Sequence, residues 1–290
     1  MEWRSAGLSW TGGAPGLRWA GGRTSPLVYG QPVAFRAVGL RRCVGAREHP
    51  CPYGAVVPGH TSRARCGECA RLDRVGSVAA DGVPDDPRTY RVYLAWFGTG
   101  LVKVGITAEE RGGARLLEQG AVAYAWLGRG PLMAARRTEE VLRAALGVPD
   151  RIPYGKKRAA RGALPGRPER AAEVESAWRA AAGLAGWPET LERVGFQVVD
   201  HAEAFGLRAL DGDRAVHDVV ELVPDGVVAG ELVAAAGPDL YLAAADGGLL
   251  VVDTRLLVGW QLVGADAAGP VSVPVRVVGP GRAGEQEGLF

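Results

Sequence analysis

The 290-residue sequence has little lysine and no long apolar run. Lysine occurs only at Lys103, Lys156 and Lys157, so arginine carries almost all of the positive charge. Together with the many glycine and alanine residues, this bias indicates a GC-rich genome, and a single arginine is therefore weak evidence of function. Apolar stretches such as "GGLLVVDTRLLVGW" are interrupted by charge well before the roughly 18 residues that a membrane-spanning helix needs. The N-terminus also lacks the pattern of a signal peptide. We expect a cytoplasmic protein with no membrane partner.

Several well-known sequence signatures are missing as well. We find no Walker loop, no Rossmann fingerprint, no nucleophile elbow and no repeat of fixed period. The hydrophobic fraction of 47% and the charged fraction of 23% are typical of globular proteins and exclude disorder throughout. The net charge of +2 hides local asymmetry, so it says little about binding partners.

Composition changes along the chain in a way that predicts three consecutive parts. Gly-rich turns alternate with short apolar pieces over the first 40 residues, which favours short strands. The stretch "VAADGVPDDPR", from Val78 to Arg88, has the Pro, Asp and Gly content of a linker. After Trp187, short β-branched runs between turn residues predict a small antiparallel sheet or barrel, ending in a frayed tail. The expected domains are residues 1–85, 86–187 and 188–290.

The middle part carries the helical patterns and the strongest local charge. We predict helices over residues 109–119, 132–146 and 169–185. Between the last two lies the segment 151–170, in which seven basic residues face Glu169 alone. This segment predicts a phosphate-binding surface for DNA or RNA through Lys156, Lys157, Arg158 and Arg161. A solvated loop is the alternative, because no aromatic residues are interleaved with the charges.

The four cysteines of the chain lie within 27 positions and predict a metal site. Cys43, Cys51, Cys66 and Cys69 have the spacing C-x7-C-x14-C-x2-C. Four thiolates complete the closed tetrahedral shell that zinc prefers in structural sites, and such a shell leaves no position for a reactive water. We therefore expect structural zinc.

Other interpretations of this cluster remain open at the level of sequence. His49 and His60 lie within it, and either could replace a cysteine as ligand. Two disulfides or four ordinary thiols are further alternatives, although a reducing compartment disfavours disulfides. His201 and His217 lie outside the cluster without metal-ligand spacing, and we interpret both as structural or surface residues.

The stretch "VYLAWFGTGLVKVGIT", residues 92–107, predicts a β-hairpin. With Gly98-Thr99-Gly100 as the loop, Tyr93 lies opposite Gly105 and diagonal to Lys103. One face of the hairpin is then wholly apolar and the other carries Tyr93, Lys103 and Gly105. This segregation is typical of a sheet buried on one face only.

The hairpin, followed by "ARLLEQGA" and "ARRTEEVLRAAL", resembles the GIY-YIG nuclease superfamily, in particular the branch whose second motif reads Lys-Ile-Gly-Ile-Thr. The resemblance covers about Tyr90 to Leu146. More closely, a cysteine cluster ahead of such a core resembles an uncharacterised bacterial family catalogued as domain of unknown function 2797. The superfamily implies a small three-stranded sheet flanked by helices and metal-assisted phosphodiester hydrolysis.

The resemblance places the motif residues on Tyr93, Gly105, Arg115 and Glu139, with Lys103 where the superfamily has a second tyrosine. It implies that Tyr93 prepares the water, that Arg115 braces the phosphate and that Glu139 holds magnesium or manganese. We expect Lys103 to lower the pKa of Tyr93 or to bind phosphate directly. The spacing after Gly105 is about two residues longer than usual, which leaves Arg111 as a rival to Arg115.

Each of these residues also has a structural interpretation. Tyr93 fits an ordinary strand aromatic, and Lys103 fits a charge that protects an edge strand. Arg115 and Glu118, like Glu139 and Arg143, are spaced for ion pairs on a helix surface.

We therefore expect an α+β protein with a zinc-stabilised N-terminal β module, a GIY-YIG-like core and a C-terminal β domain. Its expected function is metal-dependent hydrolysis of nucleic-acid phosphodiesters. The alternative is a repurposed core, which binds nucleic acid without cutting it or acts as a biosynthetic enzyme on a small molecule.

Overall fold

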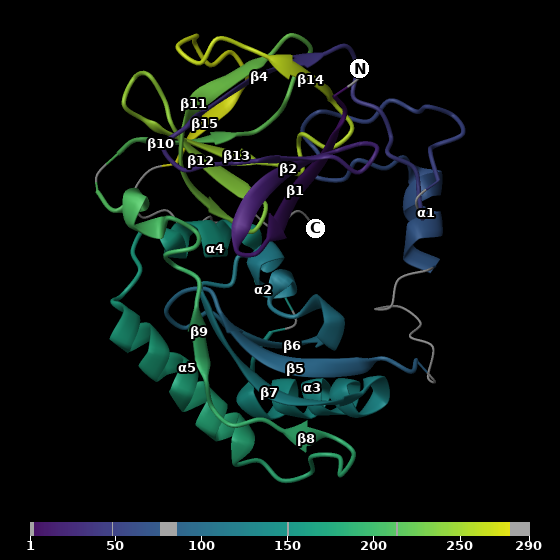
Figure 1. The fold of residues 1–290 in the computed structure, drawn as a ribbon, viewed down its shortest axis with the longest axis vertical. Helices are drawn as coiled ribbons and strands as arrows, with labels where there is room; N and C mark the ends of the chain where they lie inside the picture. The colour runs from purple at the N-terminus through teal and green to yellow at the C-terminus, as the bar shows by residue number, and fades with distance from the viewer. Residues whose placement is uncertain (1–2, 48, 76–85, 150, 213, 279–290) are drawn as a thin grey trace, which may run out of the picture. The chain divides into compact units, whose positions relative to one another are not determined.

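The structure is a computed structural model, and it describes residues 3–47, 49–75, 86–149, 151–212 and 214–278 (Figure 1). The α+β class expected from the sequence is confirmed. The chain divides into two compact units, and each is described by itself. The first unit comprises Met1–Asp81 and Gly212–Pro280, and the second comprises Gly82–Asp211 and Gly281–Phe290.

In its described residues, the first unit contains two sheets and one helix. A three-stranded antiparallel sheet is formed by β1 (Ser5–Thr11), β2 (Ala14–Trp19) and β3 (Thr24–Pro26). The larger sheet has the order β14-β4-β11-β12-β13-β10-β15, and only β10 and β13 are parallel neighbours. Its strands are β4 (Pro32–Val38), β10 (Val216–Val219), β11 (Val227–Ala236), β12 (Asp239–Ala243), β13 (Leu249–Asp253), β14 (Gln261–Gly264) and β15 (Val275–Val278). Helix α1 (Gly67–Val75) follows residues 39–66, which we call the cysteine loop because they carry Cys43, Cys51 and Cys66.

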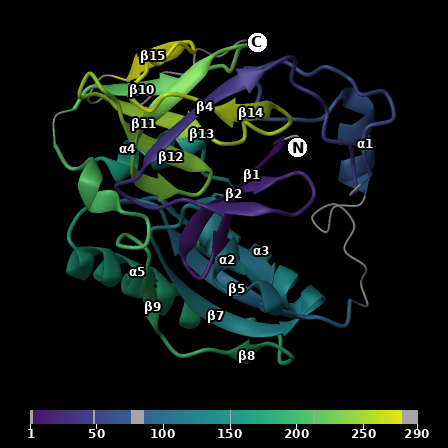
Figure 2. The same cartoon turned by 45° about the horizontal axis from the view of Figure 1, so that its top comes forward.

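Strand β4 makes this unit discontinuous in sequence. It lies between β11 and β14 and pairs with both, as Figure 2 shows. The structure therefore differs from the three consecutive domains expected above, because the C-terminal strands complete their sheet with an N-terminal strand. The expected boundary at residue 85 and the expected frayed tail lie outside the described residues. The described pairings end at β14 and β15, so the C-terminal strands form a sheet, the first of the two expected alternatives.

A buried arginine ties the cysteine loop to the large sheet. The side chain of Arg41 is 1% exposed and donates hydrogen bonds to four backbone carbonyls. Two of these, on Pro58 and Thr61, belong to the loop, at 2.7 and 2.6 Å. The other two, on Arg255 and Val258, follow β13, at 2.9 and 2.8 Å. Burial lowers the pKa of Arg41 to about 10, so the side chain stays charged at neutral pH.

The described part of the second unit has one antiparallel sheet and several helices. Its sheet has the order β6-β5-β7-β8, and β9 also pairs with β7. The strands are β5 (Thr89–Trp96), β6 (Val102–Ala108), β7 (Ala123–Pro131), β8 (Glu192–Arg193) and β9 (Val198–Asp200). The helices are η1 (Glu109–Arg111), α2 (Ala114–Gln119), α3 (Leu132–Leu146), α4 (Tyr154–Arg161), α5 (Arg167–Ala182) and η2 (Leu207–Leu210). None of the helices in the described parts of the chain is long and apolar enough to cross a bilayer.

The hairpin of β5 and β6 has the predicted register, with Tyr93 opposite Gly105. The prediction that only one face is buried is wrong. Leu94 and Trp96 are fully buried on one side of β5, and Tyr93 and Phe97 are 2% and 0% exposed on the other. The side chains of Leu116 in α2 and of Ile152 pack on the face that carries Tyr93. Helix α3 packs across β5, β6 and β7.

The predicted helices differ from the observed ones mainly near residue 112. The helix expected over residues 109–119 is split into η1 and α2, because Gly112 has a φ of 46°, which interrupts helical geometry. Helix α3 has the predicted bounds and α5 begins and ends within three residues of its prediction. Helices α1 and α4 were not predicted, because both contain more charged residues than an apolar periodicity would show.

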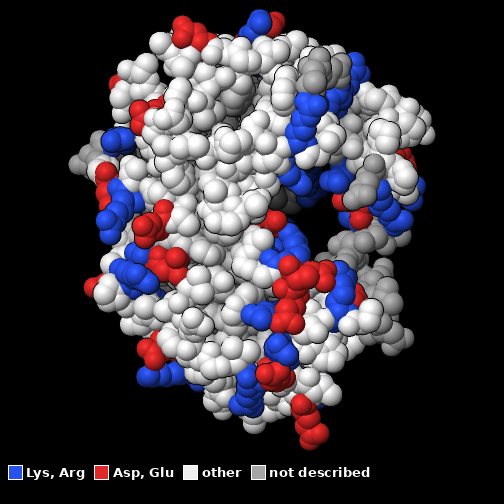
Figure 3. Space-filling model, in the orientation of Figure 1, with Lys and Arg blue, Asp and Glu red and all other residues white. Residues whose placement is uncertain are grey.

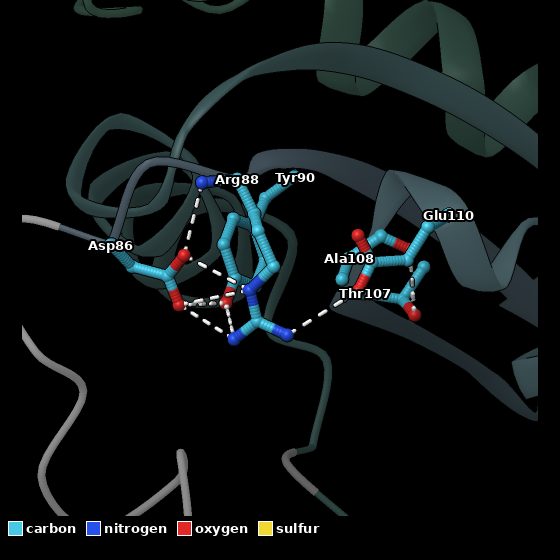
Figure 4. A network of polar contacts seen from close by, with 6 residues as sticks. All are labelled: Asp86, Arg88, Tyr90, Thr107, Ala108 and Glu110. Carbon is cyan, nitrogen blue, oxygen red and sulfur yellow. Dashed lines mark hydrogen bonds and ion pairs between the residues drawn. The ribbon is translucent and has the colours of Figure 1, made fainter.

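The start of β5 is held by a polar network that includes a buried phenol (Figure 4). The Tyr90 hydroxyl donates to Asp86 Oδ2 over 2.8 Å, and Arg88 Nη2 lies 2.9 Å from the same hydroxyl. The guanidinium of Arg88 also binds both carboxylate oxygens of Asp86. These bonds hold the pKa of Asp86 well below its usual range, while burial raises the pKa of Tyr90. The polar groups of Asp86, Arg88 and Tyr90 are hydrogen-bonded to one another, and we interpret the network as an anchor for the start of β5.

Replacing Arg41 should destabilise the first unit strongly. Arg41→Met removes a buried side chain that donates to four carbonyls, and we expect the free energy of unfolding to fall by on the order of 4 kcal/mol. Urea denaturation followed by circular dichroism measures this change. Arg36→Met is the matched control, because Arg36 is half exposed and makes one ion pair, at 3.4 Å, with Asp225. We expect the control to lose less than about 1 kcal/mol. Equal losses would contradict the anchoring role of Arg41.

Candidate functional site

The cysteine cluster lies in the first unit and brings four thiols together. The four sulfur atoms lie within 4.8 Å of one another, and the Sγ atoms of Cys51 and Cys66 are 3.9 Å apart. This separation is close to the edge of about 3.8 Å in a tetrahedron of sulfurs around zinc. All four cysteines are free thiols, so the disulfide alternative is wrong. The cluster could hold a metal such as zinc.

Local backbone geometry explains why these cysteines converge. Cys66 directly precedes α1 and Cys69 lies in its first turn, so a two-residue spacer places both on one side of the helix start. The N–H groups of Gly45 and Cys66 point at Cys43 Sγ, at 3.4 and 3.2 Å. Gly45 has a φ of 81°, and a Cβ there would lie 1.9 Å from the carbonyl oxygen of His49. Glycine is therefore required for the turn that carries the chain from Cys43 to Cys51.

The chemistry of the donors fits a cation that binds thiolates. Backbone hydrogen bonds, the strongest from Ala55, lower the pKa of Cys51 to about 6. Burial and the neighbouring sulfurs raise the pKa of Cys69 to about 12. A positive ion among the sulfurs would stabilise their thiolate forms. His49 and His60 are exposed, and among the residues that the structure describes the group of possible ligands consists of the four cysteines.

A second cluster lies in the second unit around the hydroxyl of Tyr93. Gln119, the last residue of α2, donates from Nε2 to this hydroxyl over 2.9 Å. Arg115, one helical turn earlier, lies near enough for its charge to lower the pKa of the phenol. Glu139 of α3 also acts on the phenol through its charge. The Lys103 ammonium lies 6.0 Å from the centre of the Tyr93 ring.

Gly105 decides how close the phenol can lie to β6. A Cβ at residue 105 would lie 2.4 Å from the Tyr93 hydroxyl oxygen and 2.5 Å from the carbon that bears it. No side chain fits in that space. The phenol lies across the backbone of Gly105, and this position directs its hydroxyl toward Gln119 and Arg115.

Burial makes the phenol of Tyr93 less acidic than expected from the sequence. The pKa of Tyr93 is raised by burial, which outweighs the lowering by the Gln119 hydrogen bond and by the charge of Arg115. Glu139 raises it further. The expectation that Lys103 lowers this pKa is therefore wrong, because the ring belongs to a buried apolar cluster with Phe97 and Leu116. At neutral pH the phenol keeps its proton.

The geometry separates the two candidate arginines. Arg111 binds Glu118 through Nη2, at 2.8 and 2.7 Å from the two carboxylate oxygens. Arg115 reaches the same carboxylate only at 3.8 Å, keeps a side chain that is 44% exposed and acts on Tyr93. Arg115 is thus the arginine beside the phenol. Gln119 was not predicted, although its position four residues after Arg115 puts it on the same helix face.

The basic segment does not present the surface expected for it. Lys157 is 5% exposed and Arg161 is 1% exposed, so neither can reach a phosphate outside the protein. The Lys157 ammonium lies 3.8 Å from the centre of the Phe97 ring and 3.1 Å from the carbonyl oxygen of Gln119. The assignment of Lys157 and Arg161 to nucleic-acid binding is wrong, because α4 turns this face inward. Lys156 is exposed and Arg158 is partly exposed.

The metal site makes a direct prediction. The protein should contain about one zinc ion per chain by elemental analysis, and Cys51→Ser should lose the ion and lower the melting temperature. His60→Ala is the matched control and should keep the ion, because His60 is exposed and outside the ligand group. A zinc content that survives Cys51→Ser, or that falls in His60→Ala, would contradict the four-cysteine shell.

His201 should make stability depend on pH. It is 8% exposed, and its Nδ1 lies 3.0 Å from the carbonyl oxygen of Ala121. Burial lowers its pKa below the ordinary value of about 6.5, so the unfolded chain takes up a proton before the folded chain does. The free energy of unfolding is therefore highest above pH 6.5. It falls as the pH drops further, by at most about 1.4 kcal/mol per pH unit from this group. Denaturation of His201→Gln should lack this slope and His217→Gln should keep it. The opposite pattern would exclude His201 as its source.

Comparison with known proteins identifies a family. No curated protein and no solved structure matches the chain. A family model described as protein of unknown function DUF2797 matches residues 30–262, which include the four cysteines and the cluster around Tyr93. The match spans more than half of the chain, and the chain belongs to this DUF2797 family.

Proposed function

We propose that the second unit hydrolyses nucleic-acid phosphodiesters with the help of a divalent metal. One observation carries the proposal. Arg115 of α2 and Glu139 of α3 both lie near enough to the Tyr93 hydroxyl for their charges to shift its pKa, and Gln119 of α2 holds that hydroxyl over 2.9 Å. Ion pairs on a helix surface do not need such a meeting point, whereas a reaction on a phosphate does.

The resemblance to the GIY-YIG superfamily is part of this proposal. The sheet around β5 is small and flanked by helices, as that resemblance implies. The motif residues Tyr93, Gly105, Arg115 and Glu139 follow in the expected order. The phenol of Tyr93 packs against Gly105 in space that a Cβ would fill. Two short strands, β8 and β9, enlarge the sheet beyond the three strands implied.

Arg115 and Glu139 would have the main roles in hydrolysis, as the phosphate-binding and metal-binding residues. The half-exposed guanidinium of Arg115 is placed to bind two oxygens of a phosphate and to stabilise the charge that develops there. Glu139 would hold magnesium or manganese, and a single carboxylate suits an ion that keeps most of its own waters. When bound, such an ion supplies Lewis acidity and lowers the pKa of its water. Lys103 adds a second positive charge near the ring of Tyr93.

Tyr93 receives a positioning role in place of the base expected from the sequence. Its raised pKa leaves it a neutral phenol, which cannot deprotonate water at neutral pH. As an acceptor it ties Gln119 to β5, and so it fixes the end of the helix that carries Arg115. Because a metal-bound water is already acidic, the reaction does not require a phenolate.

The test is a cleavage assay with a matched pair of variants. The purified full-length protein, with magnesium or manganese, is incubated with labelled single-stranded DNA, duplex DNA and RNA. We expect at least one substrate to be cut, and Glu139→Gln to lower the rate by about 10²-fold or more. Glu140→Gln is the control, because Glu140 is the exposed neighbour on α3 and should keep the rate.

Arginine variants test the same geometry independently. Arg115→Gln should reduce cleavage strongly, whereas Arg111→Gln should affect it little, because Arg111 is occupied by Glu118. Melting temperatures show whether the variants fold. Hydrolysis would be excluded if no substrate were cut with either metal, or if Glu139→Gln and Glu140→Gln behaved alike.

The burial of Tyr93 favours a second candidate function. A phenol that is 2% exposed and a lysine in the second motif suit a core that has kept its fold and changed its chemistry. Such a core would bind nucleic acid without cutting it, or act on a small phosphorylated or otherwise activated molecule. Salt-dependent binding of nucleic acid without any turnover would distinguish the binding protein from the hydrolase.

A further inference from the structure

The first unit carries a concentration of positive charge that the net charge of the chain conceals. Residues 3–47 contain seven arginines and no acidic residue. Glu48 is the only acidic residue between Glu2 and Glu68 in the sequence, and two more arginines, Arg63 and Arg65, lie between Glu48 and Glu68. A zinc ion bound by four thiolates would contribute −2, which leaves the segment strongly positive.

Part of this charge has a structural use and part does not. Arg41 is buried against carbonyls, and Arg36 pairs with Asp225. Arg65 pairs with Asp73 at 3.2 Å. We define the arginine face by the remaining exposed side chains that form no ion pair within the described residues, together with two exposed rings. Its members are Arg18, Arg42, Arg47, Arg63, Trp3 and Tyr53.

Hydrogen bonds to neutral groups leave the charge of this face uncompensated. Arg18 donates to the carbonyl of Ala6 over 3.1 Å, and Arg42 donates to the carbonyl of Gly54 over 2.8 Å. A carbonyl holds a guanidinium in place without cancelling its charge. The arginines are therefore oriented, and their charge still faces solvent.

Backbone contacts join the strand and the cysteine loop that carry this face. The N–H of Gly259 donates to Ser5 of β1, and the carbonyl of Gly259 accepts from Arg42, both over 3.0 Å. Arg18 lies opposite Gly7 in the same hairpin. In the loop, the N–H of Val44 donates to the carbonyl of Ala64, next to Arg63. Figure 3 shows a band of basic side chains at the upper right of the molecule, with few acidic ones among them.

Two exposed rings distinguish this face from a plain patch of charge. Trp3 is 38% exposed and Tyr53 is 76% exposed. Arg23 lies over the ring of Trp3, 5.9 Å from its centre. Arginines bind phosphates with two hydrogen bonds, and exposed rings stack on unpaired bases. This combination suits a nucleic acid better than an acidic protein, which offers no bases to stack on.

We propose that the arginine face binds the phosphate backbone of a nucleic acid. The inference rests on the proposed function, because that function identifies the bound polyanion as a nucleic acid. It adds that the arginine face supplies the affinity for this nucleic acid. The first unit then supplies binding, and the second supplies the chemistry. Substitutions in the arginine face should therefore reduce binding, and substitutions around Tyr93 should reduce cleavage. The two proposals can be tested separately.

The experiment measures binding where cleavage cannot contribute. Full-length protein carrying Glu139→Gln is titrated, without added magnesium, against labelled single-stranded DNA, duplex DNA and RNA of equal length. Anisotropy is recorded over a series of salt concentrations. Adding Arg18→Gln and Arg63→Gln should weaken binding to single-stranded DNA by about 30-fold at 0.15 M salt. The slope of log affinity against log salt should fall by about 1.4, the value for two lost phosphate contacts on a single strand.

The matched control adds Arg208→Gln and Arg214→Gln to the same background. Both of these arginines are exposed and lie outside the arginine face, so affinity and slope should not change. Zinc content and melting temperature confirm that both double variants fold. Equal weakening by the two pairs, the absence of nucleic-acid binding at low salt, or binding only to vesicles of anionic lipid would each overturn the inference.

The outcomes also separate this inference from the proposed hydrolysis. If Arg18→Gln and Arg63→Gln leave binding intact while the protein with Glu139 still cleaves, the arginine face is wrong and the hydrolase stands. If binding depends on these arginines but no metal supports cleavage, the arginine face stands and the hydrolase is wrong.

Discussion

The contact between the phenol of Tyr93 and the bare backbone of Gly105 constrains the rest of the second unit. The two residues face each other because the hairpin register pairs them. A slip by one residue would place Val104 or Ile106 opposite the ring, and even a Cβ would lie 2.4 Å from the hydroxyl oxygen. The ring would then have to leave, and the hydrogen bond from Gln119 would be lost with it. The position of Arg115 thus depends on strand register as well as on its own helix.

This register could be predicted from the sequence, because loop length and the alternation of apolar residues determine it locally. The spacing of Cys66 and Cys69 is local in the same way. The partners of β4 could not be found, since β11 and β14 lie about two hundred residues away and no local pattern marks the pairing. The burial of Tyr93 was missed for a related reason. It depends on residues such as Ile152, which come from a segment that the sequence presents as basic and exposed.

Helix α4 shows why composition alone was misleading. Lys157 and Arg161 are four residues apart and lie on one face, which is the spacing of a buried helix stripe. Because both residues are charged, the stripe does not appear as an apolar period. The Lys157 ammonium is stabilised inside by the Phe97 ring and by the Gln119 carbonyl. A charge expected to meet an external phosphate instead fixes the C-terminal end of α2, and so supports the residue that binds Tyr93.

The cysteine loop shows the opposite use of charge. Its buried cluster is small, with Cys43, Ala46, Val57 and Cys69 at its centre, and too little apolar surface is covered there to hold the loop. The four thiols and the hydrogen bonds of Arg41 provide the missing constraint. A loop held in this way need not bury its remaining side chains, and Tyr53, Val56 and the neighbouring arginines stay exposed. Because the thiols and Arg41 hold this loop, the exposed side chains at its surface are not needed to form a hydrophobic core.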